Sequence, residues 1–104
     1  MVDQHPRHRL DPVIHQPLRF SVMAVLAESE EAEFGFVRDT VQATDSALSK
    51  AVSTLEEAGY VDVRKGFVGK YPRTRLRLSR KGRSAFDEHV AILQSIAGTT
   101  SRHG

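Results

Sequence analysis

The side chains that could do chemistry in this chain are mostly cationic, and one stretch holds most of them. Residues 62–83 contain nine Lys or Arg and one acid, so this segment carries a net charge of +8 in a chain whose total is +2. Cations gathered in one part of a small protein are typical of a surface that binds a polyanion, most simply nucleic acid. The alternative is an ordinary solvated run of charge.

A second set of candidates precedes this stretch. Thr44 is a typical N-cap residue, and Leu48, Val52 and Leu55 then recur on one side of a predicted helix. The other side is small or basic and carries Ser46, Ala47, Ser49, Lys50 and Ser53. Lysine donates to O6 or N7 of guanine, and serine hydroxyls reach bases or phosphates. Together with Thr44, this face is a candidate DNA-reading surface with Lys50 as its base contact, unless it is merely a solvated helix face.

The cationic stretch itself is predicted to form a β-hairpin, because apolar and basic residues alternate along it. Gly69 and Pro72 place the loop at roughly residues 68–72, with Lys70 and Arg73 at its tip. Arg73 is then a candidate for minor-groove or backbone contact. Phosphate contacts are expected from Lys65, Lys70, Arg75 and Arg77, although the last two fit ordinary exposed-strand charges equally well.

The other predicted elements are mostly helices, and the acids at 28–33 separate the first two of them. The predicted order is a helix from Pro17, a very short strand at 32–34, a helix at 36–41 that buries Phe36, Val37 and Val41, a helix from Thr44 to about Ala58 stopped by Gly59, the hairpin, and a last helix capped by Ser79 and ending near Ala97. This pattern predicts an α+β fold with a three-helix core and a two-stranded β wing.

The last helix carries two adjoining apolar stripes, whereas packing on one core needs only one. The wider face predicts a dimer in which both ends of the chain pack across a twofold axis. The expected interface residues are Val13, Ile14, Phe86, His89, Val90, Ile92, Leu93 and Ile96. His89 fits such an apolar interface better than a metal site, because Asp87-x-His89 has no further ligands along the helix.

This order of elements is the winged helix-turn-helix arrangement, and the sequence resembles the small MarR-like winged-helix regulators of bacteria. The resemblance covers about Leu10 to Ala97. It is carried by Leu10-Asp11-Pro12-Val13-Ile14-His15, Leu48-Ser49-Lys50, Leu55-Glu56-Glu57-Ala58-Gly59-Tyr60-Val61, Lys65-Gly66-Phe67-Val68-Gly69-Lys70, Pro72-Arg73-Thr74 and Gly82-Arg83. It implies a homodimer that binds operator DNA through the third helix and the wing. The chain departs from similar proteins at Ala51, Ser53 and Thr54, where they often have longer polar or basic side chains. Few direct contacts to base edges are therefore expected.

The domain organisation expected is a mobile basic arm at 1–10, a winged-helix DNA-binding domain with dimerisation elements at both of its ends at 11–97, and a disordered tail at 98–104. With 104 residues the chain has room for one core. The absence of cysteine excludes disulfides and thiolate metal sites and fits a reducing cytoplasm. No apolar run approaches the length of a membrane span.

Catalysis is not expected, since no complete enzyme motif is present. The Gly69-Lys70 pair lacks the glycine and hydroxyl residue that a phosphate loop needs at positions 64 and 71. No cofactor or metal is predicted, and a small effector is left open, with Phe20, Met23, Phe86 and His89 as the place where one would sit. The competing function is a winged helix that serves as a protein-interaction module without specific DNA binding.

Overall fold

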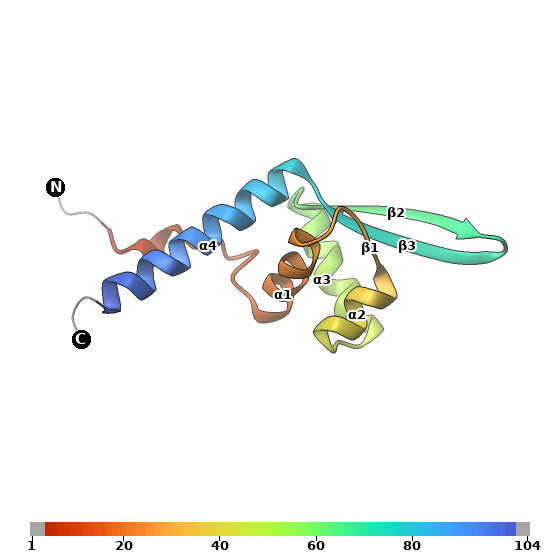
Figure 1. Ribbon diagram of the computed structural model, residues 1–104, viewed down its shortest axis with the longest axis horizontal. Coiled ribbons are helices and arrows are strands. Elements are labelled where there is room, and N and C mark those ends of the chain that lie inside the picture. Colours follow the sequence, from red (N-terminus) through yellow and green to blue (C-terminus); the bar gives the residue numbers. More distant parts are fainter. Residues whose placement is uncertain (1–3, 102–104) are drawn as a thin grey trace.

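The computed structural model describes residues 4–101 and has the predicted α+β architecture (Figure 1). In chain order its elements are η1 (Pro6–Arg9, a 3-10 helix), α1 (Pro17–Ala27), β1 (Ala32–Glu33), α2 (Phe34–Val41), α3 (Asp45–Glu57), β2 (Val61–Val68), β3 (Tyr71–Leu78) and α4 (Arg80–Ser101). The strands form one antiparallel sheet in the order β1-β3-β2. The predicted winged-helix fold class is therefore confirmed, with β1 adding a third strand to the base of the two-stranded wing.

The core lies where α1, α2 and α3 meet the base of the sheet. Its fully buried side chains include Ile14, Val22, Met23, Leu26, Val37, Leu48, Leu55, Val61 and Leu76. The wing and α4 project from opposite ends of this core (Figure 1), and the molecule measures 60 × 25 × 22 Å. Its radius of gyration is 15.9 Å, compared with about 13 Å for a compact domain of this length. The wing and α4 therefore both extend well beyond the core.

Helices α1, α3 and α4 begin at the residues that the sequence predicts. The side chain of Gln16 accepts a hydrogen bond from the backbone N–H of Arg19 (2.8 Å). Thr44 caps α3 by accepting from the N–H of Ala47 (3.1 Å), and the hydroxyl of Ser79 accepts from the N–H of Gly82 (2.9 Å). These three caps satisfy backbone donors that no helical turn can reach.

The hairpin turn is tighter than the sequence predicts. Val68 pairs with Tyr71, which leaves only Gly69 and Lys70 in the loop, and Gly69 has a φ of 62°. Such a two-residue loop with glycine first matches the right-handed twist of the strands. The predicted loop at 68–72 is therefore wrong, and Arg73 lies on β3 opposite Gly66.

Three further boundaries or contacts differ from the prediction. Phe36 is 58% exposed and not buried, because α2 begins at Phe34 and turns Val37 and the partly buried Phe34 toward the core. Residues 6–9 of the expected arm form η1 beside α4, with Pro6 in its first turn and the His5 ring accepting from the N–H of Arg7. The last helix continues past Ala97 to Ser101, and the remaining arm and tail residues, 1–3 and 102–104, lie outside the described part.

A polar cluster fastens the segment before α1 to α4. The Asp11 backbone N–H donates to Nδ1 of His89 (3.4 Å), and Nε2 of His89 lies 3.3 Å from Nδ1 of His15. The hydroxyl of Tyr60 donates to the Asp11 carboxylate, and this bond together with burial raises the pKa of Tyr60 to about 12. Burial, followed by the nearby His15, lowers the pKa of His89, which is only 1% exposed. Neutral His89 accepts at Nδ1 and keeps its proton on Nε2.

This arrangement predicts that acid destabilises the protein through His89. Since the pKa of His89 is lower in the folded chain, the unfolded chain binds more protons, and the stabilisation present above about pH 6.5 is lost as the pH falls below it. In urea unfolding from about pH 8 to about pH 5, the free energy of unfolding of the wild type should decrease as the pH falls. The His89→Gln variant should lose part of this slope. His8→Gln, at an exposed ring in η1, is the control and should retain it. An unchanged slope in His89→Gln contradicts the assignment.

Candidate nucleic-acid interface

Helix α3 presents one side to the core and the other to solvent. Leu48, Ala51, Val52 and Leu55 are buried, whereas Thr44, Ser46, Ser49, Lys50 and Ser53 are exposed and Ala47 is half-buried. The predicted division of the helix into a core face and a small, polar, basic face is therefore observed. The N-terminal half of this exposed face carries Lys50, which is the one cation of α3.

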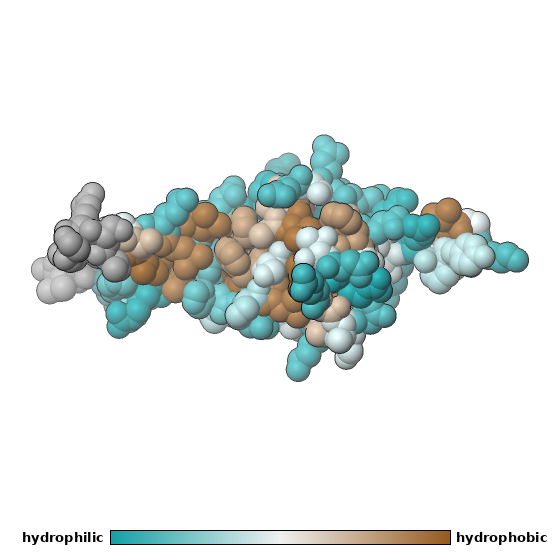
Figure 2. Space-filling view, turned by 60° about the horizontal axis from the view of Figure 1, so that its bottom comes forward, coloured by the Kyte–Doolittle hydropathy of each residue, from teal (hydrophilic) through white to brown (hydrophobic). Residues whose placement is uncertain are grey.

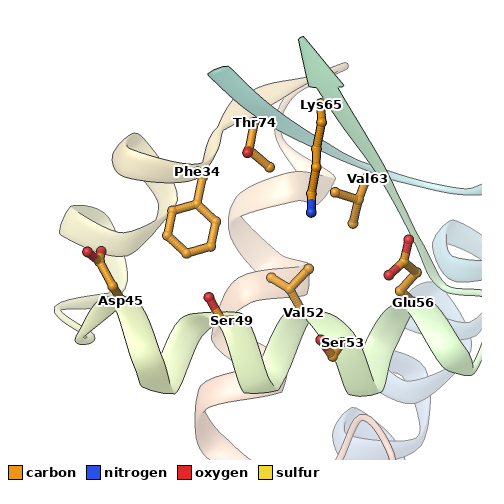
Figure 3. A pocket seen from close by; sticks show the side chains of 9 residues that line it. All are labelled: Phe34, Asp45, Ser49, Val52, Ser53, Glu56, Val63, Lys65 and Thr74. Atoms are coloured by element: carbon orange, nitrogen blue, oxygen red, sulfur yellow. The ribbon is translucent and has the colours of Figure 1, made fainter. Parts of the chain in front are cut away.

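A groove of about 470 Å³ separates α3 from the hairpin (Figure 3). It is lined by Phe34, Asp45, Ser49, Val52, Ser53, Glu56, Val63, Lys65 and Thr74. The Lys65 side chain points from β2 toward α3, across from Ser49 and Ser53 (Figure 3). Three predicted site residues from two separate elements are thus brought to one groove. The sequence pattern does not single out Phe34, Glu56 or Thr74, because their contribution depends on how the wing folds back over α3.

An ion-pair cluster holds the acid at the start of α3. Arg38 of α2 bonds to Asp45 (2.8 Å) and to its neighbour Asp39 (2.9 Å), and these bonds raise its pKa. The arginine partly offsets the negative charge of Asp45 at the end of the groove, while the Asp45 carboxylate still lies near the positive end of the helix dipole. Arg38 is a functional candidate that the sequence pattern does not reveal, since its partner lies on another helix.

The cations of the wing are divided between its two faces. Lys65 and Thr74 form a cross-strand pair on the face toward α3, whereas the arginines of β3 occupy alternate positions on the other face. All three arginines form ion pairs with acids: Arg73–Glu33 (2.6 Å), Arg75–Glu31 (3.7 Å) and Arg77–Asp62 (3.5 Å). The expected charge of the wing is therefore reduced near its base.

Arg73 is not at the tip, so the prediction that it reaches out from the end of the hairpin is wrong. Its Nη1 donates to both carboxylate oxygens of Glu33 and ties β3 to β1. The error follows from counting Pro72 as part of the loop. Proline is tolerated there because Phe67 and Pro72 form a cross-strand pair beyond the reach of β1, which pairs only at Leu76 and Arg75. Of the predicted wing contacts, Lys70 occupies the turn.

The expected interface residues fall into two groups. Ile14, His89 and Ile92 are 0%, 1% and 5% exposed within the single chain, so their assignment to an intersubunit surface is wrong. Ile14 belongs to the chain's own core, and the Asp11 N–H and the Phe20 ring lie against His89. The N-terminal segment and α1 thus cover one stripe of α4. The partly exposed members are Val13, Phe86, Val90, Leu93 and Ile96.

The place expected for a small effector, beside Phe20, Met23, Phe86 and His89, is mostly filled by these side chains themselves. Met23 is fully buried, and the ring of Phe20 lies 5.5 Å from that of Phe86 and 5.8 Å from that of His89. A shallow hollow of about 180 Å³ remains beside them, lined by His15, Gln16, Pro17, Phe20 and Leu93. Within residues 4–101, no group of three or more His, Asp or Glu is arranged to hold a metal ion. None of the described helices is long and apolar enough to cross a bilayer.

The fold and this interface together define a winged-helix protein of the kind that binds DNA. The model of the winged helix DNA-binding domain family matches residues 18–97, and the chain belongs to that family. It is 29% identical over 83 residues to the uncharacterized protein MJ0432 of Methanocaldococcus jannaschii, across 79% of this chain and 90% of that protein.

Solved structures of transcriptional regulators share the fold. A transcriptional regulator homologue from Pyrococcus horikoshii OT3 superposes with a TM-score of 0.79 at 20% identity, over 85% of this chain and 87% of the other. The Mycobacterium tuberculosis regulator MosR, in complex with DNA, gives 0.69 at 20% identity over 88% of this chain and 65% of its own. A MarR-family regulator from Silicibacter pomeroyi gives 0.64 at 18% identity over 95% and 64%. The chain thus spans slightly less than two thirds of the last two proteins, and the resemblance to MarR-like regulators is confirmed at the level of the fold.

Proposed function

We propose that this chain is a sequence-specific DNA-binding transcriptional regulator that acts as a homodimer, with α3 in the major groove and the wing on the adjoining backbone or minor groove. The observation that carries the proposal is the pairing of an exposed α3 face, bearing Lys50, with a groove on whose far side Lys65 points back at that helix. Two elements from different parts of the chain present donors to the same space.

The dimensions of these elements match duplex DNA. A helix with its side chains is about 10–12 Å wide, and the major groove is about 12 Å wide. With α3 in the major groove, the groove beside it lies where one phosphate backbone passes between helix and wing. Lys65, Ser49 and Ser53 then serve that backbone, and the remaining Ser46 and Lys50 face the bases. The MosR structure, which shares the fold, is a complex with DNA, and this supports DNA binding by the present chain.

The projecting α4 supports the homodimer. Its 22 residues make a helix about 33 Å long, and the core of the chain covers only part of it (Figure 1). Hydrophobic side chains, brown in Figure 2, gather over this end of the molecule. A second copy packed about a twofold axis covers Val90, Leu93 and Ile96 and sets two α3 helices about 34 Å apart, one turn of DNA.

The direct experiment is a gel-shift assay of the protein on the DNA upstream of its own gene, with and without excess nonspecific competitor. We expect a complex that survives the competitor and weakens steeply with salt, with a log-log slope near −5 if a dimer makes about six phosphate contacts. A protein-interaction module predicts no complex even at low salt. A complex that the competitor removes completely also contradicts sequence-specific binding.

Replacing Lys50 with alanine tests the reading face. The variant should lose about 1 to 3 kcal/mol of binding free energy per half-site and discriminate less at one base position, if Lys50 contacts guanine. Arg80→Ala, which removes one exposed cation at the start of α4, controls for net charge and should cost less. Affinities are compared on a set of single-base operator variants. Equal affinity of Lys50→Ala and wild type on every variant removes Lys50 from the interface.

A further inference from the structure

We propose that the tip of the wing binds DNA through an apolar contact, in which the ring of Phe67 enters the minor groove next to the major groove occupied by α3. The inference rests on the proposed function and adds a residue and a mode of contact to it. It replaces the arginine contact predicted from the sequence, because Arg73 lies away from the tip and bonds to Glu33.

The hairpin ends in large apolar side chains that no described residue covers. Phe67 is 75% exposed, Tyr71 69% and Val68 47%. They flank the turn at Gly69 and Lys70, and Figure 2 shows a small hydrophobic area at this far end of the molecule. An exposed apolar cluster adds nothing to the stability of the isolated chain, and its place at the end of a projecting element is typical of a contact surface.

Phe67 lies on the side of the wing that faces α3. Lys65 and Phe67 are two residues apart on β2 and so share a face, and Lys65 points toward α3 (Figure 3). Val68 and Tyr71 form the next cross-strand pair and lie on the opposite face. Phe67 is therefore about 7 Å further along the strand than Lys65, beyond the backbone that passes through the groove and over the minor groove that follows it.

The charges around the tip favour a polyanion as its occupant. Residues 63–78 include no acid, and the turn itself carries Lys70. A minor groove has a phosphate backbone on each side, so it offers an anion to Lys70 and an apolar floor and base edges to the ring at the same time. Glycine at 66 and 69, each with open space where a side chain would be, keeps the tip narrow, which suits a groove about 6 Å wide.

An aromatic ring in this position acts as a wedge. Apolar side chains that enter the minor groove partly unstack a base step and kink the duplex toward the major groove. Because the minor groove faces the protein at the wing tip, this kink bends the duplex away from the protein at that point. The wing then contributes affinity that depends only weakly on salt, in addition to the salt-dependent contacts of its lysines.

The test compares Phe67→Ala with Tyr71→Ala on a duplex that carries the site selected by the wild-type protein from a random-sequence pool. Phe67→Ala should weaken binding about fivefold or more, leave the salt slope unchanged and reduce the bend measured by energy transfer between dyes on the duplex ends. Tyr71→Ala removes an aromatic ring of similar exposure from the other face and should have the smaller effect. Lys70→Ala should instead flatten the salt slope by about one unit per wing. The exposure of all three residues means that their variants fold as the wild type does, which unfolding curves check.

A second readout uses the absence of tryptophan from the chain. Phe67→Trp provides a single tryptophan at the tip, and its emission should be quenched on the selected duplex but not on vesicles that contain anionic lipid. Equal affinity and equal bend for Phe67→Ala and wild type overturn the wedge while leaving the proposed function intact. A larger effect of Tyr71→Ala, or a tip that responds to vesicles and not to DNA, also overturns it. Failure of the wild type to select any duplex is instead the failure of the proposed function.

Discussion

Replacing Gly82 with alanine is expected to lower the free energy of unfolding by about 3 kcal/mol or more. A Cβ at this position would lie 2.0 Å from the carbonyl oxygen of Tyr60, and 2.7 Å and 2.9 Å from its carbonyl carbon and Cα. These are backbone atoms, and the same carbonyl accepts a hydrogen bond from the N–H of Ser79 (3.0 Å). Neither the first turn of α4 nor the start of the wing has room to move, so the contact between them depends on glycine.

Gly98→Ala provides the matched control for this substitution. Gly98 lies on the same helix, and a Cβ there would meet nothing within 4 Å. Alanine favours a helix over glycine by about 1 kcal/mol, so the control should be neutral or slightly stabilising. Urea unfolding of both variants decides the matter. A Gly82→Ala protein as stable as Gly98→Ala contradicts the close approach of α4 to Tyr60.

Leu93→Asp is expected to convert the proposed dimer into monomers and to weaken binding to a duplex with two half-sites by about a hundredfold or more. The side chain is half-buried on α4 within one chain, in the region that the proposed twofold contact covers. A carboxylate placed there must be buried without a partner, which costs more than the dimer contact can offset. A monomer holds only one α3 helix and binds each half-site independently.

Gln94→Asp is the control for this charge, because its position is the adjacent exposed one on the same helix. It should remain dimeric in light scattering at micromolar concentration, whereas Leu93→Asp should not. Circular dichroism checks that both variants keep their helices. A monomeric wild type under the same conditions contradicts the homodimer, and a dimeric Leu93→Asp places the contact elsewhere.

The sequence predicts those parts of the fold that local signals determine. Gln16 before Pro17, Thr44 before Asp45 and Ser79 at the start of α4 are cap residues whose bonds form within a few positions. The apolar spacing of α3 is equally local, and for that reason its exposed face was also predictable. These features are set by residues close together in the sequence and do not depend on contacts between distant segments.

The features that the sequence does not predict depend on contacts between distant segments. Glu33 reaches Arg73 only because β1 pairs with β3, and this pair holds Arg73 beside β1 and away from the tip of the wing. The turn could have been placed correctly from Gly69 and Lys70, but Pro72 nearby also favours a loop. His89 is buried by the N-terminal segment, nearly eighty residues away in the chain, so its helix stripe alone could not assign it to the chain's own interior.

Dimethyl sulfate protection on the selected duplex tests the central claim most directly, because the reagent methylates N7 of guanine in the major groove and N3 of adenine in the minor groove. If α3 occupies the major groove of a dimer's two half-sites, guanine N7 should be protected in two clusters centred about one helical turn apart. Adenine N3 should be protected just outside each cluster, where the wing tips lie. Binding that leaves every guanine N7 fully reactive would contradict the placement of α3 and with it the proposed function.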